Sequence, residues 1–247
     1  MTFVSKNKIR IIPTILYNNT TTVKGKKFKS WRTAGSLLQT SRLYSLREVD
    51  EIIFLDIAAT KNGFINLDLI ENIFDECFMP IIAGGGIKSI EDINKVLKSG
   101  ADRISINTSA FVNRKFLIDA INTFGSQCIV ISVDYKKIGD DLIVFINSGE
   151  INTNIKLFEY LHALEKIGVG EILLTSIDHD GTMSGYDYKN IKEIDKKFKL
   201  KFIVSGGASS ATDIENVVKN TNISAFSMAS IFHFTENTPL SIKKYLK

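Results

Sequence analysis

Eight short apolar runs recur along this chain of 247 residues, and they constrain its fold more than any other feature of the sequence. Each run is rich in isoleucine and valine, and segments with helical spacing separate one run from the next. Apolar strands that alternate with helices indicate a parallel sheet covered on both faces. Eight strand–helix units in a chain of this length predict an α/β fold, a single (β/α)8 TIM barrel. The runs are IRIIPTI, EIIFLDI, MPIIAGG, DRISINT, CIVISVD, GEILLTS, KFIVSGG and SAFSMAS.

The two halves of the chain also resemble each other, with matching segments close to 120 residues apart. This period is too long for a solenoid repeat, and it predicts two half-barrels of four units each, about 1–124 and 125–247. No linker rich in proline, glycine or serine lies near residue 124, so we expect one closed domain. The matching pairs are EIIFLDI with EILLTSI, MPIIAGGGIKSIEDI with LKFIVSGGASSATDI, and DRISINTSAF with ISAFSMASIF.

Composition argues against a secreted or membrane-spanning protein. Cys77 and Cys128 are the only cysteines, which suits a reducing compartment. The segment MTFVSKNKIR at 1–10 lacks the apolar run of a signal peptide, and no apolar run approaches 18 residues. We therefore expect a cytoplasmic chain that does not enter a membrane.

Charge and histidine content narrow the class of ligand. The net charge is +4, and the surplus lies largely in lysines of the first thirty residues, which form either a phosphate-attracting face or an ordinary solvated surface. No basic repeat interleaved with aromatics suggests nucleic acid. The three histidines do not cluster with cysteines, and nothing suggests a metal or an organic cofactor.

Two glycine-rich loops follow predicted strands in the two halves, AGGGI at 83–87 and SGGA at 205–208. SINTS at 105–109 and MASIF at 228–232 come one unit later in each half. Glycines let backbone N–H groups approach an anion, and helix N-termini favour negative charge. Loops of this kind can also be simple turns, but two at matching positions predict two phosphate sites at the barrel mouth.

Carboxylates end several predicted strands. Asp56 and Asp134 follow apolar residues where a strand should point into the mouth, and Asp178 and Asp180 lie in SIDHDGT. Such groups serve acid–base chemistry or hold substrate hydroxyls, and the alternative for each is a loop cap or a salt bridge. For Asp134 we favour a functional role. Lys24 either contacts phosphate or is one lysine among many.

The opposite end of the barrel is also charged. Arg10, Glu51, Arg103 and Glu171 begin the first, second, fourth and sixth predicted strands. From the residues alone, a salt-bridged plug that stabilises the bottom of the barrel is the simpler interpretation.

Taken together, these segments resemble the HisF family, the cyclase subunit of imidazole glycerol phosphate synthase. The resemblance covers nearly the whole chain and is most specific in LLTSIDHDGTMSGYD and SINT. It implies a barrel of two half-barrels that accepts ammonia from a glutaminase partner, HisH, docked on its bottom. The implied ammonia gate is Arg10, Glu51, Arg103 and Glu171, with arginine at 103 where the family usually has lysine. Asp102 matches a position at the partner interface.

At the mouth, the resemblance implies a ribulosyl phosphate intermediate with two phosphates. One of the family's two catalytic aspartates matches Asp134. The positions that match substrate- or phosphate-binding residues are Lys24, Asp56, Gly85, Asn107, Thr108, Thr175, Asp180, Gly181, Ser205, Gly206, Gly207, Ala229 and Ser230.

The other catalytic aspartate is missing. The family has Cys-Leu-Asp-Val where this chain has Thr14-Ile15-Leu16-Tyr17, so the place of the acid falls on Leu16. Asn18 is polar but lies two residues further along the strand. Leucine cannot transfer a proton, and loss of one acid–base group typically costs about 10²–10⁴ in rate.

Three functions remain open. HisF-like paralogues associated with sugar amidation also carry apolar residues at this place; with a HisH-like protein they supply ammonia to an ATP-dependent amidotransferase that forms acetamidino sugars. We favour this ammonia-delivering role in surface-glycan biosynthesis. The second hypothesis is a true cyclase that makes imidazole glycerol phosphate and AICAR in histidine biosynthesis. The third is a non-catalytic scaffold that activates the glutaminase.

Overall fold

The computed structural model describes residues 8–47 and 49–246. Residues 1–7, which make up most of the segment considered above for a signal peptide, lie outside this range.

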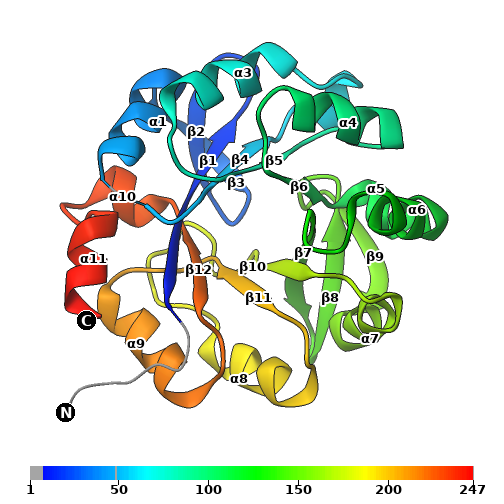
Figure 1. The fold of residues 1–247 in the computed structure, drawn as a ribbon. Coiled ribbons are helices and arrows are strands. Elements are labelled where there is room, and N and C mark those ends of the chain that lie inside the picture. The colour runs from blue at the N-terminus through cyan, green and yellow to red at the C-terminus, as the bar shows by residue number, and fades with distance from the viewer. Residues whose placement is uncertain (1–7, 48, 247) are drawn as a thin grey trace.

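Eight parallel strands form a closed barrel at the centre of the molecule (Figure 1). Around the barrel the order is β10, β11, β12, β1, β4, β5, β6 and β7, and pairing of β10 with β7 closes the ring. This confirms the predicted (β/α)8 barrel. The strands are β1 (Arg10–Tyr17), β4 (Ile52–Asp56), β5 (Ile81–Gly84), β6 (Arg103–Ile106), β7 (Ile129–Ile138), β10 (Glu171–Ser176), β11 (Phe202–Ser205) and β12 (Ala225–Met228).

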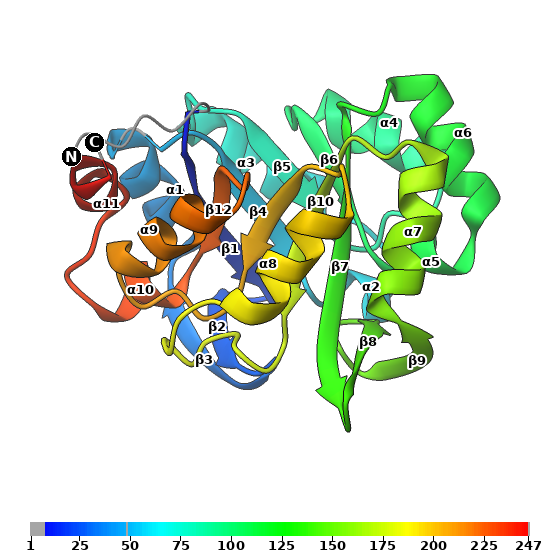
Figure 2. The same cartoon turned by 90° about the horizontal axis from the view of Figure 1, so that it is seen from below.

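Helices surround the strands, and Figure 2 shows α8 and α9 on the outer side of the barrel. Two of these helices begin with a capping box, formed by Ser89 with Asp92 in one and by Ser210 with Asp213 in the other. The outer helices are α1 (Leu37–Leu46), α3 (Leu67–Glu76), α4 (Ile90–Lys98), α6 (Arg114–Phe124), α7 (Leu157–Ile167), α8 (Tyr188–Lys197), α9 (Ala211–Asn220) and α11 (Pro239–Tyr245). Short helices follow three strands: α2 (Ala59–Asn62), α5 (Thr108–Val112) and α10 (Ser230–Phe234).

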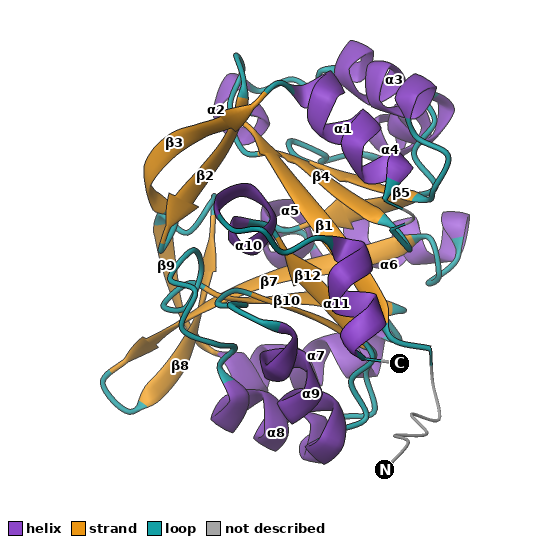
Figure 3. Cartoon of the chain, turned by 90° about the vertical axis from the view of Figure 1, so that its left-hand side faces the viewer, coloured by secondary structure: helices purple, strands orange, loops and turns teal. Residues whose placement is uncertain are grey.

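Two antiparallel hairpins extend the sheet beyond the barrel. β2 (Thr22–Lys26) and β3 (Lys29–Gly35) fold back on β1, and β8 (Asp141–Ile146) and β9 (Ile151–Lys156) continue from β7. In Figure 3 both hairpins lie on the left, at the carboxyl ends of the barrel strands. Neither hairpin is among the eight strands that the sequence predicted.

Strand alternation produces two apolar cores. Outward-facing side chains pack against the helices in the larger core. A smaller core fills the barrel interior with apolar side chains from seven strands, which we call the apolar layer: Ile12, Ile53, Ile82, Val130, Leu173, Ile203 and Ala225. Among the described residues, no helix is long and apolar enough to cross a membrane.

Candidate active site

A cavity of about 330 Å³ opens at the carboxyl ends of the barrel strands. All the residues predicted above to bind substrate or phosphate line it, and so does Asp134. The residues thus brought together come from both halves of the chain. Asp178 does not line the cavity, and its carboxylate accepts a hydrogen bond from the Lys137 backbone N–H at 2.9 Å.

Asp134 is the buried carboxylate of the mouth. It ends the barrel part of β7, is 7% exposed, and its Oδ2 accepts a hydrogen bond from Asn107 Nδ2 at 3.1 Å. Burial raises the pKa of Asp134 to about 7, and the nearby Asp180 adds to the rise, while hydrogen bonds from Thr175 and Asn107 oppose it. A carboxyl group with such a pKa can both hold and release a proton near neutral pH.

Asp56 is held by its own loop. Its Oδ1 accepts hydrogen bonds from the N–H groups of Ala58 and Ala59 at 3.0 and 3.1 Å. Burial raises the pKa of Asp56, and these two backbone hydrogen bonds partly offset the rise. This is the loop-cap arrangement that the sequence left open for a strand-end carboxylate.

Lys24 and Asp180 form a buried ion pair. Lys24 Nζ lies 2.6 and 2.8 Å from the two carboxylate oxygens of Asp180, and the side chains are 4% and 9% exposed. Lys24 comes from β2, so the pair ties the β2–β3 hairpin to the loop after β10. The Lys27 N–H also donates to the Asp180 carbonyl at 2.8 Å, which holds the hairpin over the cavity.

The glycine loops approach the backbone of neighbouring strands closely. A Cβ on Gly85 would lie 2.3 Å from the Asp56 carbonyl oxygen, and one on Gly206 would lie 2.6 Å from that of Ser176. Both glycines have left-handed backbones, with φ of +120° and +94°. Asp56 and Ser176 occupy equivalent places in the matching segments EIIFLDI and EILLTSI, so the two halves build the same contact.

The first strand ends without an acid. Leu16 is 9% exposed, lines the cavity, and pairs with Leu55 of β4. Asn18, the nearest polar residue along the strand, does not line the cavity, and its N–H donates to the Thr21 carbonyl. Within the described residues, the carboxylates that line the cavity are Asp56, Asp134 and Asp180, and none of them lies on β1.

The sequence reasoning missed several apolar residues of the cavity. Phe28 and Trp31 reach it from the β2–β3 hairpin, and Met183 from the loop after β10. The one local signal for Phe28 and Trp31 was the aromatic content of KGKKFKSW, which did not reveal that this segment folds back over the mouth, and no local signal pointed to Met183.

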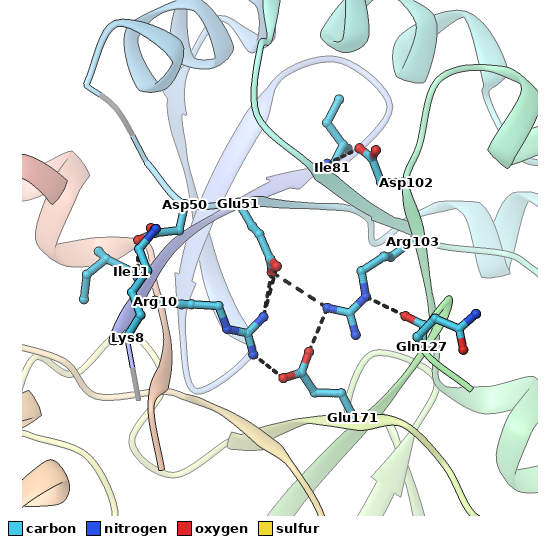
Figure 4. Close-up of polar contacts among 10 residues, drawn as sticks. All are labelled: Lys8, Arg10, Ile11, Asp50, Glu51, Ile81, Asp102, Arg103, Gln127 and Glu171. Atoms are coloured by element: carbon cyan, nitrogen blue, oxygen red, sulfur yellow. Dashed lines mark hydrogen bonds and ion pairs between the residues drawn. The ribbon is translucent and has the colours of Figure 1, made fainter. Parts of the chain in front are cut away.

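The four charged residues at the bottom form a closed ring (Figure 4). Arg10 Nη1 lies 3.0 Å from Glu51 Oε1, and Arg10 Nη2 bonds Glu171. Arg103 Nη1 lies 2.7 Å from Glu171 Oε2 and 3.8 Å from Glu51 Oε2. Burial opposes the charge of Arg10, but the Glu171 and Glu51 carboxylates outweigh it and raise the pKa of Arg10. Each charge therefore faces two opposite charges, and the ring is neutral overall.

Arg103 has an additional anchor. Its Nε donates to the Gln127 backbone carbonyl oxygen at 3.0 Å while its Nη1 faces the two carboxylates, so separate nitrogens of the planar guanidinium make these contacts (Figure 4). The guanidinium plane is thereby fixed against the ring.

Asp102 lies beside this ring and is exposed. Its Oδ2 accepts a hydrogen bond from the Ile81 N–H at 2.8 Å, just as Asp50 Oδ2 accepts one from the Ile11 N–H at 3.1 Å (Figure 4). In both cases the residue before a member of the charged ring accepts a hydrogen bond from an N–H at the start of a neighbouring strand, because Ile81 is the first residue of β5 and Ile11 the second residue of β1. The described residues contain no group of three His, Cys, Asp or Glu side chains that could hold a metal ion.

Sequence comparison with known proteins identifies the family of this chain. The family model described as "Histidine biosynthesis protein" matches residues 10–238. The chain is 45% identical over 239 residues to hisF2 of Campylobacter jejuni, a provisionally assigned imidazole glycerol phosphate synthase subunit, covering 97% of this chain and 95% of the relative. It is 41% identical over 241 residues to the imidazole glycerol phosphate synthase subunit HisF of Hydrogenobaculum sp., covering 96% and 95%. This chain therefore belongs to the HisF family of histidine biosynthesis proteins.

Proposed function

We propose that this chain is the barrel subunit of a glutamine amidotransferase, which receives ammonia from a HisH-like glutaminase and delivers it for sugar amidation rather than for cyclisation. The observation that carries the proposal is the combination of a complete charged ring at the bottom with Leu16 at the mouth. The first feature suits passage of ammonia, and the second removes an acid that cyclisation needs.

The bottom of the barrel supplies the entrance. The ring of Arg10, Glu51, Arg103 and Glu171 is the gate, and the apolar layer lies directly above it along the strands. Asp102 lies beside Arg103 (Figure 4). We expect the glutaminase to dock on this end of the barrel. A neutral molecule crosses the apolar layer at far lower cost than an ion.

The mouth holds a phosphorylated small molecule. Gly85 with Thr108 forms one phosphate site, and Gly206 and Gly207 with Ser230 form the other. The remaining residues predicted for substrate binding complete the cavity, with Asp134 as the retained acid–base group. An ATP-dependent sugar amidotransferase in the cytoplasm accepts the ammonia.

One observation favours the alternative, a true cyclase that makes imidazole glycerol phosphate and AICAR. Asp134 has a pKa of about 7 and a fixed hydrogen bond from Asn107, which suits a working acid–base group. A cyclase of this kind would carry out with one carboxylate what its relatives do with two.

The deciding experiment is a cyclase assay of the purified chain with the ribulosyl phosphate intermediate and excess ammonium at alkaline pH. We expect no turnover for the wild type and measurable turnover for Leu16→Asp, which should be lost again when Asp134→Asn is added. Turnover by the wild type that Asp134→Asn abolishes would establish the cyclase instead.

A second assay separates delivery from scaffolding. The chain, the glutaminase and the sugar amidotransferase are combined with glutamine, ATP and the N-acetyl sugar, and the acetamidino product is measured. We expect glutamine-dependent product only when the chain is present. Glutaminase activation by the chain, without any transfer of nitrogen to the sugar, would identify a non-catalytic activator.

A further inference from the structure

The two glycine loops at the mouth differ in charge at one matching position. Gly85 and Gly206 make the same backbone contact in the two halves, and three residues further on the first half has Lys88 where the second has Ser209. Lys88 lines the cavity, whereas Ser209 does not, and the Ser209 hydroxyl donates to Asp213 at 2.8 Å. The phosphate site of the first half therefore has a lysine beside it at a position where the second half has a neutral side chain.

Lys88 belongs to an exposed part of the cavity wall, which we call the outer wall. Its four residues line the cavity and are exposed, whereas Gly85 and Thr108 of the adjoining phosphate site are half-buried. None of the four is among the binding residues that the resemblance to the HisF family implies. The outer wall consists of Thr60, Gly63, Lys88 and Val112.

Hydrogen bonds between three segments hold the outer wall next to the phosphate site. The Ser109 hydroxyl, one residue after Thr108 in α5, donates to the Ile87 carbonyl in the glycine loop. Lys88 Nζ lies 3.5 Å from the carbonyl oxygen of Gly63, which ends α2. The glycine loop is thus tied to α5 on one side and to α2 on the other, so the outer wall continues directly from the phosphate site.

The positive charge of the outer wall comes from the Lys88 side chain. Within residues 8–47 and 49–246, this ammonium forms no ion pair, and its contact with the Gly63 carbonyl is long. The N-terminus of α4 contributes little, because the backbone N–H groups of Lys88 and Ser89 already donate to Asp92 Oδ2 at 3.0 Å. An anionic group placed against the outer wall would therefore be held by Lys88 rather than by the helix.

We propose that the mouth binds a diphosphate ester, with one phosphoryl group at Gly85 and Thr108 and the adjoining phosphoryl group beside Lys88. The inference rests on the phosphate site of the proposed function and adds the class of the ligand. A phosphate monoester at Gly85 leaves the Lys88 ammonium unused, whereas the two phosphoryl groups of a diphosphate share a bridging oxygen and must lie side by side. Because the outer wall is exposed, the organic group of the ester extends out of the cavity.

Calorimetric titration of the purified chain tests this inference. Inorganic phosphate and inorganic pyrophosphate are titrated separately at constant ionic strength and without divalent metal ions. We expect pyrophosphate to bind the wild type roughly tenfold more tightly than phosphate. Lys88→Met should weaken the binding of pyrophosphate by about five- to tenfold and that of phosphate by less than about twofold. Lys98→Met, which removes an exposed lysine at the other end of α4, should change neither affinity.

Two organic diphosphates distinguish the sources of such an ester. Uridine diphosphate represents a nucleotide, and geranyl diphosphate represents a lipid carrier. We expect both to bind the wild type and both to bind Lys88→Met more weakly, because they share the diphosphate group. Tighter binding of uridine diphosphate would assign the site to a nucleotide, and tighter binding of geranyl diphosphate would assign it to a lipid carrier; either order supports the inference.

The outcomes separate this inference from the proposed function. If phosphate and pyrophosphate bind equally well, or if Lys88→Met and Lys98→Met have the same effect, Lys88 is an ordinary solvated lysine and the inference is wrong. If neither anion binds, the phosphate site of the proposed function is wrong as well. A preference for pyrophosphate that depends on Lys88 supports the inference even if no glutamine nitrogen reaches a sugar, a result that would overturn only the role in amidation.

Discussion

Lys24 Nζ lies 2.6 Å from Asp180 Oδ1, although the two residues are 156 positions apart in the chain. One residue belongs to a hairpin that folds back over the mouth, and the other to the loop after β10. Both side chains are buried, so removing one charge of this pair costs more free energy of unfolding than removing one charge of a surface pair.

We predict that Asp180→Asn destabilises the protein by about 3–5 kcal/mol, because it leaves the Lys24 ammonium buried without its counter-charge. Replacing both residues, as Lys24→Met with Asp180→Leu, should cost less than Asp180→Asn alone. Urea unfolding of the variants measures the difference. Loss of the exposed Lys61–Glu150 pair through Lys61→Met serves as the control, with an expected cost below about 1 kcal/mol. Equal costs for both ion pairs would contradict the prediction.

The charged ring leads to a prediction about the share of glutamine nitrogen that reaches the product. Arg103→Ala removes the cation shared by Glu171 and Glu51 and should let ammonia escape, so that less of the glutamine nitrogen reaches product. Arg103→Lys keeps the charge but loses the bond to the Gln127 carbonyl, and should have an intermediate effect. The ratio of product to glutamate measures the coupling. Lys95→Ala, on the exposed side of α4, is the control; an unchanged ratio in Arg103→Ala would refute the gate.

Asp134 predicts a specific dependence of stability on pH. Its folded-state pKa of about 7 lies above the ordinary carboxyl value, so between about pH 4 and 7 the folded protein holds a proton that the unfolded chain has released. Stability therefore falls as pH rises through this window. Asp134→Asn cannot ionise and should gain up to about 4 kcal/mol over the wild type at pH 8, but little at pH 4.

Urea unfolding of both proteins at the two pH values checks this result. Asp140→Asn, in the exposed turn between β7 and β8, controls for the loss of one carboxyl charge. If the free energies of unfolding of Asp134→Asn and wild type differed by the same amount at both pH values, burial would not be destabilising the ionised Asp134 carboxylate.

The glycine loops give a prediction with a matched control. Gly85→Ala and Gly168→Ala both place a side chain on a left-handed backbone, which costs roughly 1–2 kcal/mol. The Cβ at position 168 meets nothing within 4 Å, whereas at 85 it would meet the Asp56 carbonyl at 2.3 Å. Thermal unfolding should therefore show a larger loss for Gly85→Ala. Similar losses of stability for the two variants would mean that the loop at Gly85 shifts enough to accommodate the added methyl group without cost.

The sequence by itself determined the barrel and the side chains that face its axis. Apolar strands alternating with helices specify a parallel sheet, and the two-residue period of a strand places Arg10, Ile12, Thr14 and Leu16 on one side of β1. The glycine-rich loops and the strand-end carboxylates were expected at the mouth because the carboxyl ends of all barrel strands meet at one face. The full set of binding residues was implied by the resemblance to the HisF family, and Phe28, Trp31 and Met183 were not predicted. The division into half-barrels stays a prediction, and so do the roles of the individual site residues.

The tertiary structure decided which of these groups pair. Asp56 looked equivalent to Asp134 in sequence, but it caps its own loop while Asp134 bonds Asn107. The Lys24–Asp180 pair, the closure of the charged ring and the Thr14–Ser227 contact join residues that are far apart in the chain. Such contacts depend on how strands are staggered around the barrel and on where the β2–β3 hairpin folds, and local patterns of residues carry neither.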